Sequence, residues 1–225
     1  MAEWKNDEQL LELIEKELYT AVIGDICDIL GKRKTFLNPD IRPLDGPISQ
    51  RCMAGRAMTV LEVNTFYDKE DDPQPFGRML EALDDLKKGE IYICAGAGSF
   101  ATIGELMCTA MIARGARGAV SDSFIRDRGI KDLDFPVFSK GFYGQDQRGR
   151  GKVIDFRVDI EINGVKIQSG DLIVGDTDGV MVVPRELEEE IITKALEKAR
   201  GEKIVQEEIR KGMLATTAFK TYGIM

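Results

Sequence analysis

A glycine-rich turn followed by a predicted helix start is the first candidate site in the sequence. Residues 95–98 form the turn, and Gly104 and Glu105 open a helix soon after it. The first amide groups of a helix lack helical partners and lie at the positive end of its dipole, so they can hold a carboxylate or a phosphate. A structural interpretation competes, because glycines also close tight turns and Glu105 also favours a helix start. The local sequence alone favours the structural interpretation.

The adjacent pair Arg126 and Asp127 is the second candidate. Neighbouring side chains on a regular strand point to opposite faces, so the pair acts together only at a strand end or at a bend, which Gly129 favours. The guanidinium then offers paired planar donors to a carboxylate or an enolate oxygen. The carboxylate offers the oxygen ligand that Mg²⁺ or Mn²⁺ prefers. The alternative is an exposed ion-pairing loop, because the surrounding sequence DSFIRDRGIKDLD carries many charges of both signs.

The absence of histidine excludes several classes of enzyme. With no histidine among 225 residues, Ser-His-Asp catalysis, Cys-His catalysis and His-ligated zinc are all excluded. The four cysteines, at positions 27, 52, 94 and 108, form no CxxC pair, and we expect reduced, mostly buried thiols. The chemistry must therefore come from carboxylates, Arg, Lys, backbone amides or a hard metal ion.

The composition indicates a compact protein of the cytoplasm. Hydrophobic residues make up 43% of the chain and charged residues 31%, which is too apolar for a disordered chain. The formal net charge of −8 disfavours broad binding to nucleic acid. No apolar run approaches the ~20 residues that span a bilayer, and the N-terminus lacks the features of a secretory signal. We therefore expect no membrane or nucleic-acid partner.

Hydrophobic periodicity predicts helices at both ends of the chain and in its middle. The N-terminal helices span about residues 7–30, with Asp7 as the N-cap and Gly31 as a left-handed cap. Shorter helices are expected at 76–87 and 104–114. A long charged helix at about 185–211 closes the chain. Its expected inward positions are Leu187, Ile191, Leu196, Ile204 and Ile209.

Short apolar runs between turn residues predict the strands. They lie at residues 57–63, 90–94, 118–121, 135–139, 154–160, 165–167, 172–175 and 179–183. Prolines and glycines predict a loop over 31–50, and the acidic segment 64–76 is expected to be an exposed loop. Mixed strands and helices without a linker indicate a single layered α/β or α+β domain over residues 1–225.

The spacing of residues in the middle of the chain resembles the signature of the RraA-like superfamily. The matching positions are Gly104, Leu106, Ala110, Arg114, Gly115, Gly118, Asp122, Arg126 and Asp127. The resemblance extends to Asp25, Asp28 and the segments 135–138 and 170–184, so it covers about residues 18–210. This superfamily contains the class II 4-hydroxy-4-methyl-2-oxoglutarate / 4-carboxy-4-hydroxy-2-oxoadipate aldolases and the regulators of ribonuclease E.

The resemblance implies both a fold and a site. The fold is an α/β one, a swivelling β/β/α domain with a long C-terminal helix, assembled as a homotrimer or homohexamer with sites between subunits. The substrate's pyruvate carboxylate would rest on the amides of Gly104, Glu105, Leu106 and Met107. Arg126 would contact the 2-oxo acid, Asp127 would ligate Mg²⁺ (or Mn²⁺), and Glu105 would lie near the water shell of the metal. A neighbouring subunit's C-terminal helix would add a glutamate, either Glu207 or Glu208.

Three features depart from the family pattern. Ser123 stands where a glycine is usual, and Ala95 stands where many relatives have an aspartate. The segment 64–76 lacks the usual stretch containing Asp-Asn. These departures bear on the identity of the substrate more than on the metal.

The expected reaction passes through the enolate of pyruvate, whose growing negative charge must be stabilised. A divalent metal ion or a lysine Schiff base does this, and the sequence between Lys88 and Lys131 contains no lysine, which favours the metal. We therefore predict a metal-dependent lyase, a class II pyruvate aldolase with oxaloacetate decarboxylation as a side activity. Arg126 and Glu105 are its expected catalytic residues. The alternative is a non-catalytic regulator of ribonuclease E that acts by protein–protein binding.

Overall fold

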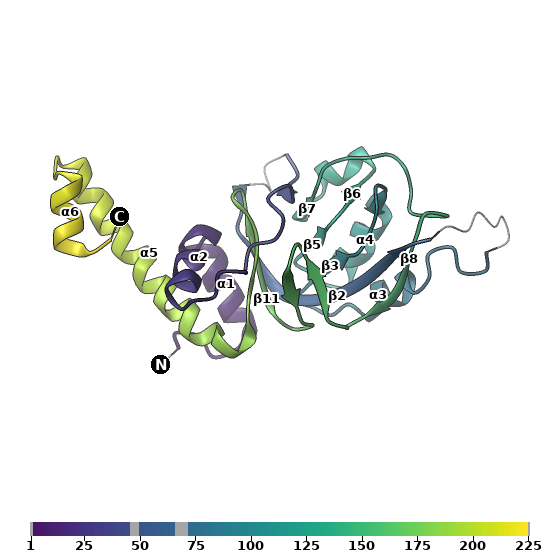
Figure 1. Cartoon of the computed structure of the whole chain (residues 1–225), viewed down its shortest axis with the longest axis horizontal. Helices are drawn as coiled ribbons and strands as arrows, with labels where there is room; N and C mark the ends of the chain where they lie inside the picture. Colours follow the sequence, from purple (N-terminus) through teal and green to yellow (C-terminus); the bar gives the residue numbers. More distant parts are fainter. Residues whose placement is uncertain (1, 46–49, 66–71, 225) are drawn as a thin grey trace.

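The longest strand, β2 (Met53–Asn64), lies at the centre of an eight-stranded mixed sheet in the computed structural model, which describes residues 2–45, 50–65 and 72–224 (Figure 1). Three parallel strands follow β2 on one side: β3 (Glu90–Ala95), β5 (Gly118–Ser121) and β7 (Val137–Ser139). The short β1 (Arg42–Pro43) closes that edge in antiparallel orientation. On the other side of β2, β11 (Leu172–Asp176) and β12 (Gly179–Val183) form an antiparallel hairpin. The remaining strand, β8 (Gly151–Phe156), pairs with the second half of β2.

Two smaller strand pairs complete the β structure. One is the hairpin of β9 (Ile160–Ile162) and β10 (Val165–Ile167), and the other is the parallel pair of β4 (Ala101–Ile103) and β6 (Phe124–Ile125). The β9–β10 hairpin packs on one face of the central sheet, where its isoleucines join a buried cluster with Ile91 and Ile93.

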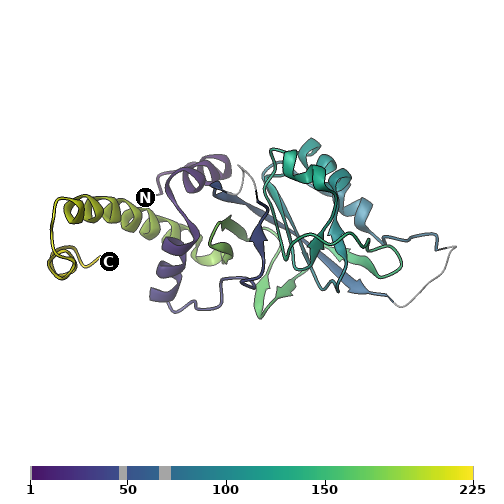
Figure 2. The same cartoon turned by 90° about the horizontal axis from the view of Figure 1, so that it is seen from above.

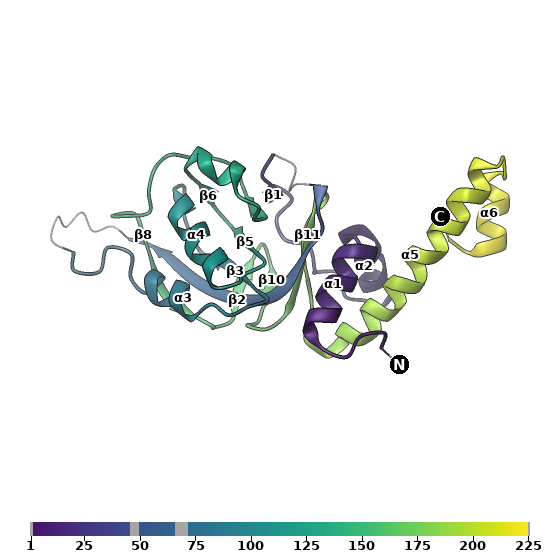
Figure 3. The same cartoon turned by 180° about the vertical axis from the view of Figure 1, so that it is seen from behind.

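Helices α3 (Met79–Asp85) and α4 (Glu105–Ala113) cover the opposite face of the central sheet (Figure 3). Even-numbered residues of β2 and β3, such as Met58 and Tyr92, are buried against them. The alternation follows from the two-residue period of a strand, which sends successive side chains to opposite faces. A single-turn helix, η2 (Arg128–Asp132), follows β6 and packs beside α4.

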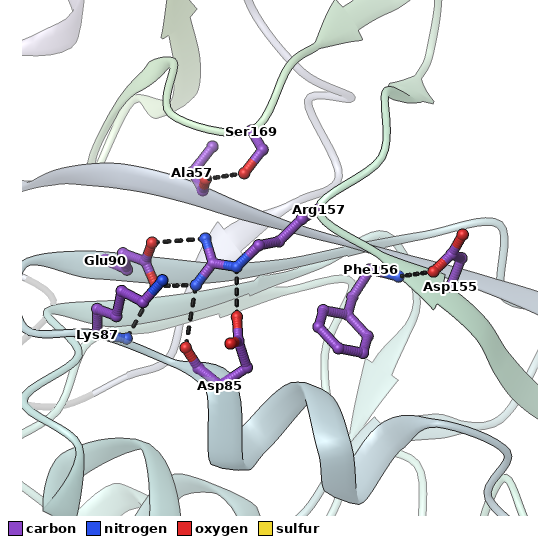
Figure 4. Close-up of polar contacts among 8 residues, drawn as sticks. All are labelled: Ala57, Asp85, Lys87, Glu90, Asp155, Phe156, Arg157 and Ser169. Atoms are coloured by element: carbon purple, nitrogen blue, oxygen red, sulfur yellow. Dashed lines mark hydrogen bonds and ion pairs between the residues drawn. The ribbon is translucent and has the colours of Figure 1, made fainter.

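Arg157 fixes the C-terminal end of α3 to the start of β3 (Figure 4). Its Nη1 and Nη2 donate to the two carboxylate oxygens of Glu90 at 2.8 and 3.0 Å, and its Nε donates to the Asp85 carboxylate. Nη2 also donates to the Asp85 carbonyl at 3.0 Å. This paired, planar geometry is the one that a guanidinium forms best with carboxylates. The contacts set where α3 lies on the sheet.

A separate helical layer packs on the β11–β12 hairpin. It consists of α1 (Asp7–Glu17), α2 (Thr20–Ile29) and the first half of α5 (Glu188–Arg210), which follows the short η3 (Arg185–Leu187). The second half of α5 extends beyond this layer, and α6 (Ala215–Tyr222) folds back along it (Figures 1 and 2). We call residues 201–224 the arm.

The structure confirms the α/β class and the long C-terminal helix, and it corrects several details. Asn6 caps α1 in place of Asp7, because its side chain accepts a hydrogen bond from the Gln9 amide at 3.0 Å. Ile191 and Leu196 are buried as predicted, whereas Ile204 and Ile209 lie on the projecting arm and are 55% and 37% exposed.

Several elements were absent from the sequence prediction, among them β1 within the predicted 31–50 loop, β4, β6 and α6. Part of the predicted loop 64–76 and residues 46–49 lie outside the described residues. Among the helices of the described chain, none combines the length and the low charge needed to cross a bilayer.

Candidate active site

The parallel pairing of β4 and β6 brings the two candidate sites of the sequence together. Ala101 pairs with Phe124 and Ile103 with Ile125, and the Arg126 amide then donates to the Ile103 carbonyl at 3.0 Å. The carboxyl ends of parallel strands lie at the same edge. Residues 104–105 and 126–127, which follow these two strands, are therefore neighbours although they are 22 positions apart in sequence.

Asp127 lies directly against the start of α4. Its Oδ2 accepts a hydrogen bond from the Glu105 amide at 3.0 Å, so it satisfies one of the unpaired amide groups of that helix end. Its backbone is bent, with φ of 74° and ψ of 111°, a conformation outside the usual allowed regions for a residue with a side chain. The predicted bend after the strand is thus confirmed. It occurs at Asp127 itself.

Gly104 is the N-cap of α4, and its lack of a side chain allows this contact. A Cβ atom at this position would lie 2.9 Å from Asp127 Oδ2 and 3.6 Å from Arg126 Nε. Any larger residue would therefore push the aspartate from the helix start. The first helical hydrogen bond of α4 runs from Cys108 to Gly104, so the amides of Leu106 and Met107 precede the helical ladder.

The Glu105 carboxylate packs over Gly129 in η2. A Cβ atom on Gly129 would lie only 2.2 Å from Glu105 Oε2, so glycine is required there for the present position of the carboxylate. Two acidic side chains, Glu105 and Asp127, consequently lie at the same end of α4. A shallow hollow beside them is lined by Glu105, Asp127, Arg128, Gly129, Lys131 and Asp132.

Within the described part of the chain, Arg126 has one ion pair, a loose one with Asp146. Its Nη2 lies 3.7 Å from Asp146 Oδ2, and the Arg126 side chain keeps 38% of its surface exposed. The backbone of residues 142–146 runs beside the β4–β6 pair, with bridges from Phe142 to Ile125 and from Asp146 to Ala101. The guanidinium therefore has donors free to meet a ligand from the cavity.

A cavity of about 330 Å³ opens between α3, α4 and the end of the β4–β6 pair. Arg126, Asp127, Asp146 and Gly104 lie at its polar end, with Thr102 and Gln147 beside them. The helices line the rest with apolar side chains. Its volume falls within the usual range of small-ligand sites. Asp127 lines both this cavity and the hollow beside Glu105, so a cation held by its carboxylate would face both.

The donor set of this end suits a hard cation. The available side-chain donors are the carboxylate oxygens of Asp127 and Glu105, which are ligands that Mg²⁺ or Mn²⁺ prefers. The described residues contain no cluster of three Asp, Glu, Cys or His side chains arranged to hold a metal ion. Mg²⁺ commonly binds through one or two carboxylates and completes its shell with water and substrate oxygens. The residues present therefore fit a magnesium ion of that kind.

The cysteines near the site are poor nucleophiles. All four are free thiols, as predicted, and three of them are buried. Burial, together with the charges of Glu105 and Asp127, raises the pKa of the Cys108 thiol to about 12. Since the thiolate is the reactive form, Cys108 does not act as a nucleophile near neutral pH.

The departures from the family pattern have structural consequences near the site. Ser123 is buried, and its hydroxyl lies within hydrogen-bond distance of the Gly98 and Phe100 carbonyls. It thereby ties the glycine-rich turn to the segment that leads into β6. Ala95, the last residue of β3, is buried in the core.

Two further predicted residues lie away from this site. Glu207 and Glu208 are on the arm, at the opposite end of the chain's long axis from α4 (Figure 1). Glu208 Oε1 accepts from Lys211 Nζ at 2.8 Å. Neither glutamate reaches the cavity of its own chain.

Sequence reasoning missed Asp146 and the wall formed by α3. Asp146 lies in a loop rich in glycine, glutamine and arginine that has no hydrophobic period. Its side chain meets Arg126 only because the loop pairs with β4 and β6, two strands too short to be predicted. No signal in the sequence indicated this contact.

Comparison with known proteins places the chain in a family. The family model described as Aldolase/RraA (RraA-like) matches residues 20–182. The chain belongs to the RraA-like family. Its resemblance to this superfamily, inferred from motif spacing, is thereby confirmed, and the RraA-like fold with it.

Two relatives and one solved structure illustrate the similarity. A Halalkalibacterium halodurans protein named "Putative 4-hydroxy-4-methyl-2-oxoglutarate aldolase" is 32% identical over 146 residues, covering 63% of this chain and 68% of that protein. An uncharacterized Methanocaldococcus jannaschii protein is 31% identical over 213 residues, covering 88% and 95%. The crystal structure of Streptomyces coelicolor RraAS2, described as an unusual member of the RNase ES inhibitor RraA protein family, superposes with a TM-score of 0.76 at 22% identity, covering 90% and 98%. The RraA-like family thus includes proteins named as aldolases and proteins named as ribonuclease inhibitors.

Proposed function

We propose that this protein is a divalent-metal-dependent lyase that releases pyruvate from 4-hydroxy-2-oxo acids, with oxaloacetate decarboxylation as a side activity. One observation supports the proposal above the others. The Asp127 carboxylate, the first residues of α4 and the Arg126 guanidinium meet at the polar end of one cavity, and the Glu105 carboxylate lies in the adjoining hollow that Asp127 also lines. This set provides anion binding, cation binding and proton transfer within one small volume.

The carboxylate of the substrate would bind at the start of α4. The amides of Leu106 and Met107 precede the helical ladder, and the Glu105 amide is shared with Asp127. The helix dipole adds favourable potential for a negative charge. Arg126, which has only a loose partner, would donate to the carboxylate or to the 2-oxo oxygen from the side of β6.

A retro-aldol step also requires stabilisation of the growing negative charge and removal of a proton, and residues around this position would provide both. A divalent ion at Asp127 would act as a Lewis acid on the oxygen that gains charge. Arg126 would stabilise the same charge by hydrogen bonding. Glu105 would accept, directly or through water, the proton of the C4 hydroxyl, and the electron pair of the breaking C3–C4 bond would pass to the pyruvate half.

The assembly and location of the protein belong to the same proposal. The arm carries exposed apolar side chains, and it also carries Glu207 and Glu208, which are far from the cavity of their own chain. In a homotrimer or homohexamer the arm would bring one of these glutamates to a neighbour's site. We also propose that the protein acts in the cytoplasm, on a small 2-oxo acid, without a membrane or nucleic-acid partner.

A regulator of ribonuclease E remains the alternative function. The similarity to RraAS2, at 22% identity, shows a shared fold and does not extend to a shared partner. The convergence of catalytic groups at a cavity favours the lyase, because a regulator that acts through its surface needs no such arrangement.

The test is Mg²⁺-dependent pyruvate release from oxaloacetate and 4-hydroxy-2-oxo acids by the wild-type protein and by Asp127→Asn. Asparagine keeps the size of the side chain, and its Oδ1 can still accept a hydrogen bond from the Glu105 amide, whereas alanine would lose this contact at the helix start. Asp134→Asn is the matched control, because Asp134 is an exposed partner of Arg51 outside the cavity. We expect kcat/KM to fall on the order of 10²–10³-fold in Asp127→Asn alone.

The proposal requires that EDTA abolish pyruvate release and that Mg²⁺ restore it. Activity that persists in EDTA, or that is unchanged in a folded Asp127→Asn protein, contradicts the metal-dependent lyase. Binding to a ribonuclease E segment with no pyruvate release from any substrate would favour the regulator.

A further inference from the structure

The positive charge in the cavity is enough to neutralise a single carboxylate of a ligand. Among the described residues that line it, Arg126 is the one cationic side chain, and it faces two acidic ones, Asp127 and Asp146. Arg128 and Lys131 line the separate hollow beside Glu105. Once Arg126 and the α4 amides hold the carboxylate of a 2-oxo acid, a second carboxylate in the cavity would lack a positive partner.

The rest of the cavity wall is apolar. Its side chains come from α3 and α4, and they are Met79, Leu80, Leu83, Leu106, Met107 and Ala110. Leu80 and Leu106 lie at the rim, where they are 60% and 85% exposed. Binding an aliphatic group against this wall is favourable because apolar surface is removed from water. Binding a carboxylate there is unfavourable, because the carboxylate loses its hydration and finds no positive partner.

The position of this wall is fixed by contacts outside the cavity. The Arg157 ion pairs hold the end of α3 to β3 (Figure 4), and buried Gln147 donates to the Met79 sulfur at 2.8 Å. Helices α3 and α4 lie side by side over the sheet (Figure 3). The apolar wall is therefore held in a defined position beside the polar end of the cavity.

From this distribution of charge we propose that the protein prefers 4-hydroxy-2-oxo acids with a single carboxylate and an aliphatic tail. The proposal rests on the proposed lyase function and adds the substrate class. It differs from the dicarboxylate substrate in the name of the Halalkalibacterium halodurans relative. A representative reaction cleaves the C3–C4 bond of 4-hydroxy-2-oxohexanoate. The C4 hydroxyl loses its proton and becomes the carbonyl of propanal, and C3 of the pyruvate enolate takes up a proton to give pyruvate.

The experiment compares two substrates that differ only at the last carbon. The wild-type protein with Mg²⁺ is assayed for pyruvate release from 4-hydroxy-2-oxohexanoate and from 4-hydroxy-2-oxoadipate, in which a carboxylate replaces the terminal methyl group. We expect kcat/KM to favour the aliphatic substrate on the order of 10- to 100-fold. Equal values or a preference for the dicarboxylate overturn the substrate class while the lyase stands. Cleavage of neither compound, nor of oxaloacetate, contradicts the lyase itself.

A charge placed in the wall tests the cause of the preference. Leu80→Lys adds a cation at an exposed position of α3, so it should raise kcat/KM for the dicarboxylate and reduce the ratio about tenfold. Ile29→Lys, on α2 and 72% exposed, adds the same charge far from the cavity and should leave the ratio unchanged. Binding of 2-oxohexanoate and 2-oxoadipate, measured by calorimetry, should follow the same order without turnover. A ratio that Leu80→Lys leaves unchanged contradicts the assignment of the tail to this wall.

Discussion

Two arginines in this chain occupy contrasting environments. Arg157 meets two carboxylates and a carbonyl, with its Glu90 contacts at 2.8 and 3.0 Å, and it joins α3 to β3. Arg126 meets one carboxylate at 3.7 Å and faces a cavity. Arg157 has its donors satisfied within the fold, and those of Arg126 stay available. The difference indicates a structural role for Arg157 and is consistent with the proposed binding role of Arg126.

The backbone has a positive φ at Arg157 and at the residue that follows Arg126. Arg157 itself has φ of 57°, and the residue after Arg126, Asp127, has φ of 74°. Such conformations cost free energy in residues other than glycine and persist only where the surroundings enforce them. At Arg157 the side chain is held by the ion pairs to Asp85 and Glu90. At Asp127 it turns a carboxylate toward α4 and the cavity, which supports a functional role.

Of the substitutions that test this contrast, Arg126→Lys should produce the largest effect. An ammonium group cannot reproduce the paired planar donors, so we expect kcat/KM for pyruvate release to fall on the order of 10²-fold. Because the ion pair with Asp146 is loose, the melting temperature should change by less than about 2 °C. Kinetics and thermal melts of one preparation measure both. If Arg126→Lys lost much stability and kept full activity, Arg126 would have a structural role and the proposed binding role would be wrong.

Arg157→Lys is the matched substitution and should show the reverse pattern. Lysine can replace only part of the bonding to Asp85 and Glu90, whose side chains are 39% and 12% exposed. We expect a loss of about 1–2 kcal/mol in the free energy of unfolding. Denaturant titration measures that loss. Activity at 25 °C should stay within about twofold of the wild-type value, since most of the protein remains folded.

Gly129→Ala should reduce activity through Glu105. The new Cβ atom would lie 2.2 Å from Glu105 Oε2, so the carboxylate must move away from its place beside Asp127. We expect kcat/KM to fall about tenfold, with a change in its pH profile if Glu105 accepts the proton. Gly144→Ala is the control, because an added Cβ atom meets nothing within 4 Å there. Equal effects of the two substitutions would argue against a role for the Glu105 position.

The smallest predicted effect concerns a buried carboxyl group, Glu62, on β2. Burial raises its pKa to about 8, and its Oε1 has no hydrogen-bond partner among the described residues. The folded state therefore holds a proton that the unfolded state releases near pH 4.5. This contribution to stability is present at low pH and is lost as the pH rises toward 8.

Replacing Glu62 with a residue that does not ionise should make the free energy of unfolding less dependent on pH. We expect the free energy of unfolding of Glu62→Gln, relative to that of the wild type, to be higher at pH 9 than at pH 5 by at least about 1 kcal/mol. Denaturant titrations of both proteins at the two pH values give the comparison. A difference that does not change with pH would show that Glu62 ionises normally.

The sequence was sufficient to predict the long elements, and it provided a set of candidate site residues. The apolar period of the α1 and α5 segments and the glycine cap at Gly31 predicted where helices lie, and Gly31 has the expected positive φ. Chemistry and spacing identified Gly104, Glu105, Arg126 and Asp127 before the fold was known. Their convergence, however, depends on β4 and β6, which are too short to produce a detectable pattern.

Other features followed from tertiary structure alone. Ile204 and Ile209 fit an inward-facing helical stripe, but the helix extends beyond the layer that would cover them. Asp146 joins the site through a loop, and α3 supplies the apolar wall from a position set by its packing on the sheet and by the Arg157 contacts at its end. Such contacts join residues far apart in the chain, so the local sequence pattern does not predict them.

The central claim is that a cation at Asp127 and the start of α4 bind one 2-oxo acid together. Calorimetric titration of oxalate, a planar mimic of the pyruvate enolate, into the protein tests it without turnover. We predict that oxalate binds in the presence of Mg²⁺, that EDTA removes binding, and that Asp127→Asn weakens it at least tenfold. Oxalate binding of equal strength with EDTA, or in Asp127→Asn, would contradict the account.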